Sequence, residues 1–174
     1  MMLRSLAALL VLAAPLSAET APYAGRDADA VAALPPERVE GLRAGAGLGY
    51  ALPAELNGLP GPLHVLELAP ELDLTADQRD AAGAIRRAML RRAVPLGERV
   101  IAAETALDAA FADPALTAAR VAELTAEAGA AEAALRAAHL AAHLEMAPLL
   151  TRHQRALYAR LRGYAGADGA HGGH

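Results

Sequence analysis

The sequence predicts an all-α protein built on a long antiparallel helical hairpin, and three observations support this class. The 174 residues are 55% hydrophobic but only 3% aromatic, so strands would lack the aromatic residues that they favour. Ala and Leu dominate instead, and both are strong helix formers. Apolar residues recur at spacings of three and four in two long stretches. A Leu-Thr-x-x-Gln pattern occurs twice, at 74–78 and 150–154.

Residues 1–18 are predicted to be a signal peptide. Arg4 precedes an apolar run from Leu6 to Leu16, and the small Ala18 follows. The run is too short to span a bilayer, which takes about 20 apolar residues. We therefore expect export to the periplasm, with cleavage near Ala18 and no transmembrane span afterwards. An uncleaved anchor is the alternative, because Leu16 is larger than the residue usually found three positions before a cleavage site.

Residues 19–62 are expected to form an irregular N-terminal arm, because this part of the chain is rich in Gly and Pro. Short helices are compatible with the sequence only at 36–43 and near 52–56. The arm is expected to be flexible and to pack loosely on the later helices through Tyr50, Leu52 and Leu56.

The helical domain is expected to span residues 63–164 and to contain four helices. The first helix is short, at about 63–72. The second begins after Thr75 and continues to about Phe111. Pro95 removes one backbone hydrogen bond and is expected to kink this helix, with two separate helices as the alternative.

A short turn at 113–117 is expected to return the third helix antiparallel to the second. The third helix runs to about Ala147 and carries a seam of apolar or small residues that alternates threes and fours. The seam consists of Val121, Leu124, Ala128, Ala131, Leu135, Ala138 and Ala142. The fourth helix is expected at 152–164, and residues 165–174 are expected to form a flexible, His-containing tail.

The two Leu-Thr-x-x-Gln patterns have a local structural meaning. The hydroxyl of Thr75 can accept a hydrogen bond from the backbone of Gln78, whose side chain reaches back to the Thr75 backbone N–H. This arrangement is a capping box, and Leu74 is placed to pack against the helix that the box begins. Leu150, Thr151 and Gln154 repeat the same pattern before the fourth helix.

Absent residues exclude several kinds of enzyme chemistry. Ser5 and Ser17 are the only serines, and the chain has no cysteine and no lysine. A mature protein without residues 1–18 therefore lacks Ser, Cys and Schiff-base nucleophiles, and also the lysine of a phosphate-binding loop. A net charge of -4 with few aromatic residues argues against a nucleic-acid partner. We expect a protein that is not an enzyme and requires no cofactor.

An exported, cysteine-free helical chain with two Leu-Thr-x-x-Gln motifs beside a long hairpin resembles the periplasmic Spy/CpxP family. The resemblance covers about residues 63–164. It implies a curved helical homodimer that binds unfolded or misfolded envelope proteins without ATP. It also implies, as a related role, an envelope-stress adaptor that acts on a membrane signalling partner.

A branch of this family contains zinc-responsive and nickel/cobalt-sensing periplasmic proteins, which use His, Glu and Met from the short first helix and the end of the third. The run 143–146, His-Leu-Glu-Met, is similar to that branch. The pattern departs from the nickel/cobalt sensors, because Ala142 stands where they have a histidine four residues before the methionine. Those sensors also keep a membrane anchor, which this chain is expected to lack.

His139 and His143 are the centre of the candidate metal site, because they lie about one helical turn apart and could hold one ion through two imidazoles. A third ligand would come from Met146, Glu145, His64 or a partner subunit. Met146 would favour copper(I), whereas His and Glu alone would favour zinc, nickel or cobalt. The alternative is that both histidines only help to fill the alanine seam.

A basic cluster early in the second helix is the candidate client-binding surface, because arginine combines charge with a long apolar stem. The cluster comprises Arg86, Arg87, Met89, Arg91 and Arg92. Acidic residues dominate the far end of the hairpin. The alternative for the basic cluster is a solvated face that pairs with the acidic end of a second subunit, and an antiparallel homodimer would satisfy both interpretations.

Overall fold

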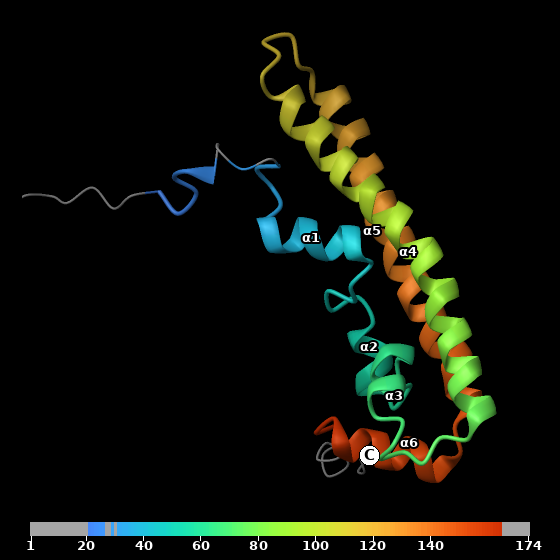
Figure 1. Ribbon diagram of the computed structural model, residues 1–174. Coiled ribbons are helices and arrows are strands. Elements are labelled where there is room, and N and C mark those ends of the chain that lie inside the picture. Colours follow the sequence, from blue (N-terminus) through green and yellow to red (C-terminus); the bar gives the residue numbers. More distant parts are fainter. Residues whose placement is uncertain (1–20, 27–28, 30, 165–174) are drawn as a thin grey trace, which may run out of the picture.

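The computed structural model describes residues 21–26, 29 and 31–164, and these residues form helices joined by turns. Two long helices, α4 (Ala76–Ala110) and α5 (Ala118–Met146), lie side by side along the molecule (Figure 1). The segment 111–117 joins them and reverses the chain. The described residues contain no β-strand, so the predicted all-α class is confirmed for them. The predicted signal peptide and tail lie outside the described residues.

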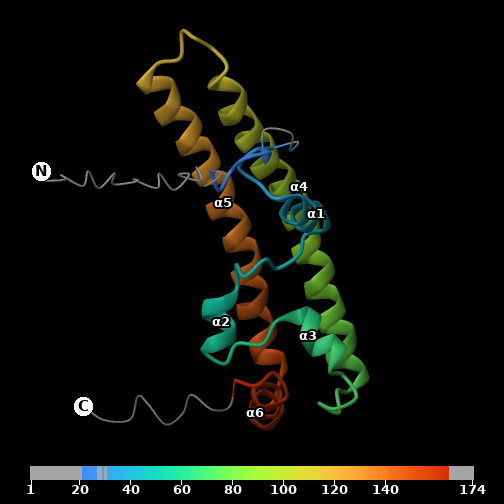
Figure 2. The same ribbon diagram turned by 90° about the vertical axis from the view of Figure 1, so that its left-hand side faces the viewer.

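Four shorter α-helices accompany the α4–α5 pair. Three of them follow one another along one side of the pair, and the fourth lies at the end where α5 stops (Figure 2). They are α1 (Pro36–Ala44), α2 (Leu52–Leu56), α3 (Pro62–Glu67) and α6 (Arg152–Leu161). A 3-10 turn, η2 (Ala147–Leu149), leads from α5 to α6. The described residues thus contain six α-helices: α3 to α6 are the four expected in the helical domain, and α1 and α2 form at the two places where the sequence is compatible with short helices.

The segment before α3 is held by its own buried side chains. Leu42 is 1% exposed and Tyr50 is 3% exposed, whereas Leu52 and Leu56 are 52% and 60% exposed. The expectation of loose packing through these residues is therefore wrong: Tyr50 is fully packed, and the two leucines face solvent. The reason is that α2 has a single turn and packs only its small Ala54 inward.

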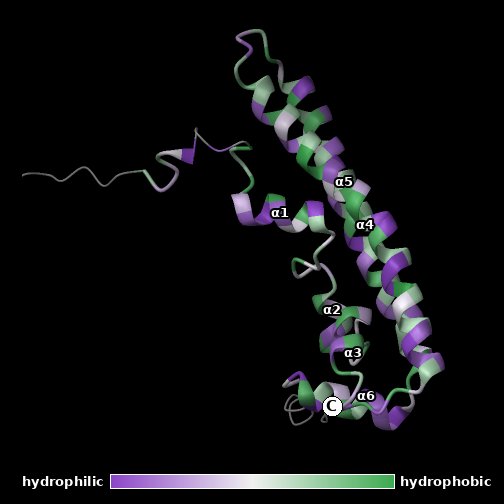
Figure 3. Ribbon diagram, viewed as in Figure 1, coloured by the Kyte–Doolittle hydropathy of each residue, from purple (hydrophilic) through white to green (hydrophobic). Residues whose placement is uncertain are grey.

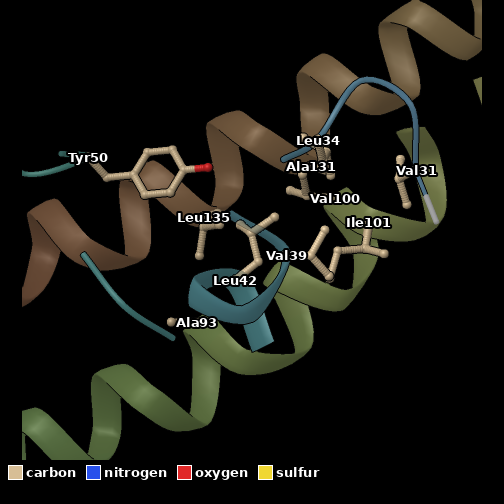
Figure 4. Close-up of a cluster of buried hydrophobic side chains, with 10 residues drawn as sticks. All are labelled: Val31, Leu34, Val39, Leu42, Tyr50, Ala93, Val100, Ile101, Ala131 and Leu135. Atoms are coloured by element: carbon tan, nitrogen blue, oxygen red, sulfur yellow. The ribbon is translucent and has the colours of Figure 1, made fainter. Parts of the chain in front are cut away.

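A first hydrophobic cluster forms where α1 crosses the α4–α5 pair (Figure 4). Leu42 of α1 and Leu135 of α5 are each 1% exposed, and they are among the largest fully buried side chains. The cluster also contains Val31, Leu34, Val39, Tyr50, Ala93, Val100, Ile101 and Ala131. Burial of each large aliphatic side chain stabilises the fold by about 1.5–3 kcal/mol, so this cluster fixes α1 on the long helices.

Helix α4 continues without interruption through Pro95, so the alternative of two separate helices is wrong. Two residues later, Gly97 is buried under α1. A Cβ atom at Gly97 would lie 2.3 Å from the carbonyl oxygen of Leu42, which leaves no space for any side chain. The sequence interruption at 95–97 therefore marks the place where a second helix crosses, and it does not mark the end of a helix.

A second hydrophobic cluster joins α3, the start of α4 and α6. It contains Val65, Ala69, Leu72, Leu74, Ala82, Met146, Leu150 and Tyr158. Both leucines of the Leu-Thr-x-x-Gln motifs, Leu74 and Leu150, are buried here. The two motifs therefore begin their helices from one shared core.

Both predicted capping boxes are present. The side chain of Thr75 accepts from the backbone N–H of Gln78, and the Gln78 side chain accepts from the Thr75 backbone N–H. Thr151 and Gln154 make the same two hydrogen bonds at the start of α6.

The two glutamine side chains also bind each other across 76 residues of sequence. Gln78 Nε2 donates to Gln154 Oε1 at 2.9 Å, and Gln154 Nε2 donates to Gln78 Oε1 at 3.0 Å. Each amide also donates to a main-chain carbonyl beside the other motif, at Leu149 and Leu72 respectively. The repeated motif thus joins the starts of α4 and α6, because each glutamine caps its own helix and binds the other cap.

Hydrophobic and hydrophilic residues are mixed along the whole length of α4 and α5 (Figure 3). Across the parts of the chain that the structure describes, every helix is too short or too polar to cross a membrane.

Candidate functional site

A groove with a volume of about 610 Å³ opens between the short helices and the α4–α5 pair. Its walls come from the loop 44–49, from α2, α3, α4 and α5, and from the residues that follow α6. Sites for small molecules commonly have volumes of about 300–1,000 Å³. The groove is therefore large enough for a small ligand or for a few side chains of a partner.

The groove brings together residues from both sets that the sequence singled out. His64, His139 and His143 come from the candidate metal set, and Arg86 and Met89 come from the candidate client-binding set. They belong to α3, α5 and α4, so only the tertiary structure places them around one space.

The remaining candidates lie elsewhere. Met146 is fully buried in the second hydrophobic cluster, and Glu145 is exposed outside the groove. Arg87, Arg91 and Arg92 are exposed on α4 and do not line the groove. In residues 21–26, 29 and 31–164, no three His, Cys, Asp or Glu side chains are grouped closely enough to hold a metal ion.

His139 is buried on α5, with only 3% of its surface exposed. Its ring stacks on Tyr50, with 5.7 Å between the ring centroids and 16° between the planes. Its Nε2 atom is buried and has no hydrogen-bond partner. Burial lowers the pKa of the His139 imidazole below its ordinary value, and the neighbouring charge of His143 lowers this pKa further. At neutral pH the ring is therefore uncharged.

His143 is oriented by the chain that enters α3. Its Nδ1–H donates to the carbonyl oxygen of Leu59 at 2.9 Å, because a carbonyl can only accept. In a neutral ring, Nε2 then carries the free lone pair. A Cβ atom at Gly61 would lie 2.9 Å from this Nε2 atom, so the absence of a side chain at Gly61 makes room for the imidazole.

Glu55 and Tyr158 form a second polar contact at the edge of the groove. The Tyr158 hydroxyl donates to the Glu55 carboxylate, with 2.9 Å to each oxygen, and accepts from the Gly61 backbone N–H at 3.4 Å. Burial, followed by the negative charge of Glu55, raises the pKa of Tyr158 above its ordinary value. Glu55 is thus already engaged by a hydroxyl donor.

Tyr50, whose ring covers His139, is itself held by an ionic contact to α5. Arg38 donates to Glu132 at 2.7 Å and to the Tyr50 hydroxyl at 3.1 Å, and that hydroxyl also donates to Glu132. Burial, together with the hydrogen bond to Glu132, raises the pKa of Tyr50 to about 12. The contact fixes the loop after α1 against α5 and so fixes one wall of the groove.

Sequence reasoning missed three residues that shape the groove: Tyr158, Glu55 and Arg162. The burial of Tyr158 was detectable in principle, because it lies four residues after Gln154 on the same face of α6. Glu55 and Arg162 gave no sequence signal. Glu55 lies 103 residues away from its partner Tyr158 along the chain.

Comparisons of the chain with protein-family models, with curated proteins and with solved structures gave no match. The resemblance to the Spy/CpxP family therefore stays a prediction, which rests on the duplicated motif and on the helical architecture.

Proposed function

We propose that the chain is a periplasmic, non-enzymatic protein that binds unfolded or misfolded envelope proteins without ATP, as a chaperone or envelope-stress adaptor of the Spy/CpxP type. Residues 1–18 would direct its export. The observation that supports this best is the concentration of exposed leucines at the groove. Of the eight large hydrophobic residues described as exposed, four lie between positions 48 and 63: Leu48, Leu52, Leu56 and Leu63.

An exposed apolar patch of this kind commonly marks an interaction surface. Three of the four leucines, together with Met89, line the groove, and Arg86 lies on the same wall. Unfolded polypeptides expose apolar side chains between polar and charged ones. A surface with leucines, a flexible methionine and arginine stems is suited to bind such segments with little sequence preference.

The expected partner arrangement is a homodimer. Arg91 and Arg92 are exposed on α4, and acidic residues such as Asp108, Glu123 and Glu127 lie toward the far end of the α4–α5 pair. Two antiparallel copies would place these opposite charges against each other. A membrane signalling partner would use the same exposed surface in the adaptor role.

Replacing the groove leucines should remove client binding. We expect the wild-type protein from residue 19 onward to suppress aggregation of an unfolding client, followed by light scattering, at a near-equimolar ratio. The Leu52→Ser/Leu63→Ser variant should need at least about fivefold more protein, because each substitution removes about 1–2 kcal/mol of apolar contact. Leu144→Ser is the matched control, because Leu144 is 63% exposed on α5 and does not line the groove.

Equal suppression by the wild type and by Leu52→Ser/Leu63→Ser would contradict the groove as the client site. Failure of the wild type to suppress aggregation at all would contradict the chaperone function itself.

A second candidate function is metal binding, and the orientation of His143 supports it. Histidine ligands usually donate their other ring N–H to a carbonyl or carboxylate, as Nδ1 of His143 does to Leu59. His139 on the same helix has an unpartnered Nε2. His64 lines the same groove but is not grouped closely enough with these two histidines to complete a site, so a partner subunit would supply the third ligand. Because Met146 is buried elsewhere, nitrogen donors would favour zinc, nickel or cobalt over copper(I).

Calorimetric titration with zinc, nickel, cobalt and copper(I) tests the metal-binding function. We expect His139→Ala/His143→Ala to bind the preferred ion at least about tenfold more weakly than the wild type, because a single remaining imidazole does not form a tight site. His153→Ala, which changes an exposed histidine of α6, should bind like the wild type. Equal, weak binding by all three proteins would reject the site.

A further inference from the structure

Leu48 lies in a turn whose geometry favours other residue types. The backbone N–H of Tyr50 donates to the carbonyl oxygen of Gly47 at 2.8 Å and closes the turn. The two residues between them, Leu48 and Gly49, have φ angles of 43° and 78°. Positive φ at both central positions favours Gly, Asn or Asp, because the left-handed conformation brings the Cβ atom of most residues too close to the backbone. A leucine at position 48 is therefore held in a strained conformation.

The side chain of Leu48 packs on helix α1. A Cβ atom at Gly41 of α1 would lie 2.7 Å from Leu48 Cδ2, so this contact requires the absence of a side chain at Gly41. Glycine inside a helix is less favourable than alanine, so the contact also costs helix stability. Although Gly41 fixes the leucine side chain, 36% of Leu48 remains exposed and the residue lines the groove. Two local costs thus hold one partly exposed apolar side chain at the groove.

The residue before Leu48 leaves open space beside it. Gly47 also lines the groove, and a Cβ atom there would meet nothing within 4 Å. Its φ angle lies outside the positive range, so a residue with a side chain could adopt the same conformation. Neither conformation nor packing among the described residues therefore requires glycine at this position. Glycine also allows a second backbone to approach closely, so the space beside Leu48 suits the main chain of a polypeptide partner.

We propose that Leu48 is the anchor on which an unfolded client segment packs, and that Gly47 leaves room for the main chain of that segment. This role rests on the proposed client binding and names the residues responsible for it. Strained residues persist at functional sites because the surrounding structure holds them in place. Here the turn and Gly41 orient the leucine before the client arrives, so binding costs little side-chain entropy. Leu48 belongs to neither hydrophobic cluster, so its apolar surface is available to a partner.

Leu48→Asn tests the anchor, with reduced and carboxymethylated α-lactalbumin as a permanently unfolded client. Fluorescence anisotropy of the labelled client gives its Kd for the protein from residue 19 onward. Leu48→Asn should raise this Kd about tenfold, because an apolar contact is lost. Its Tm should stay within about 4 °C of the wild type, because relief of the strain offsets the lost contact with Gly41. Leu144→Asn, which changes a leucine that is 63% exposed outside the groove, should bind the client like the wild type.

Gly47→Gln tests the open space without changing Leu48. The new side chain would occupy the place of the client main chain, so the Kd should rise at least about fivefold. The Tm, measured by circular dichroism, should change by less than about 4 °C, because the added Cβ atom meets nothing in the folded chain. Gly129→Gln is the matched control. Gly129 is an exposed residue of α5 with equally open surroundings, it lies outside the groove, and its replacement should leave the Kd unchanged.

The outcomes separate this role from the client-binding function. No client binding by the wild type would overturn the function itself, and the anchor with it. If the wild type binds the client, an unchanged Kd in Leu48→Asn or in Gly47→Gln overturns only the role given to that residue. A decrease in the Tm of Leu48→Asn by more than about 4 °C would show that Leu48 serves the packing of α1 instead.

Discussion

Replacing Gly97 by alanine should lower the free energy of unfolding by about 3 kcal/mol. The new Cβ atom would lie 2.3 Å from the Leu42 carbonyl oxygen and 2.8 Å from its carbonyl carbon. These are backbone atoms of α1, so no side-chain rotation relieves the contact. Helix α1 must move away from α4, and the burial of Leu42 and Val39 is then lost. Urea denaturation followed by circular dichroism measures this loss.

Gly129→Ala is the matched control in the same pair of long helices. Gly129 lies inside α5, and a Cβ atom there would meet nothing within 4 Å. Alanine at this site should raise the free energy of unfolding by about 0.5–1 kcal/mol, because alanine is the better helix former. If both substitutions stabilise the protein, then α1 does not dock on Gly97 in solution.

Gln154→Ala should lower the free energy of unfolding by about 2–4 kcal/mol, because the glutamine is buried and its removal leaves several main-chain groups without partners. Gln154 is only 8% exposed. Its amide accepts from the Thr151 N–H at 2.9 Å and donates to the Leu72 carbonyl at 3.2 Å, besides its two bonds to Gln78. Thermal unfolding should show a decrease in Tm of about 5–10 °C.

A double-mutant cycle with Gln78→Ala isolates the contact between the two motifs. If the glutamines act together, the two losses should be non-additive by about 1–2 kcal/mol. Additive losses at Gln78 and Gln154 would show that each glutamine is only a local cap.

Thr117→Ala is the control for a simple cap. Thr117 accepts one hydrogen bond from the backbone N–H of Arg120 at the start of α5, and its replacement should cost about 1 kcal/mol.

The helix starts were predictable from sequence because their determinants are local. The hydrogen bonds of the two capping boxes span three residues, so Thr75 and Thr151 identify the first turns of α4 and α6 without any tertiary information. The alanine seam of α5 was predictable for a similar reason. Spacings of three and four put Leu124 and Leu135 on one face, and both are buried.

The arm before α3 was less predictable, because its structure depends on distant partners. Glycine and proline predicted an irregular segment, yet Leu42 and Tyr50 are buried against α4 and α5. The ionic contact that holds Tyr50 joins it to Glu132, 82 residues away. Local sequence gives no indication of a contact at such a separation.

The candidate site was predictable in part. The spacing of His139 and His143 correctly placed both on one face of α5, and both are buried at the groove. The same argument put Met146 with them, but its side chain lies in the second hydrophobic cluster, where α6 packs. Glu145 follows one residue after Leu144 and is exposed with it, because the helix there turns its outer face to solvent.

The sequence by itself determined the helical class and the starts of the two motif helices. It also determined which nucleophilic and phosphate-binding residue types the chain lacks. These features follow from propensities and from hydrogen bonds between near neighbours, which act whatever the rest of the chain does. Only the tertiary structure decided that Gln78 and Gln154 bind each other and that α1 crosses at Gly97. It also decided that His64 and Arg86 line the same groove. Packing between such distant segments depends on shape and on the buried surface of the whole fold.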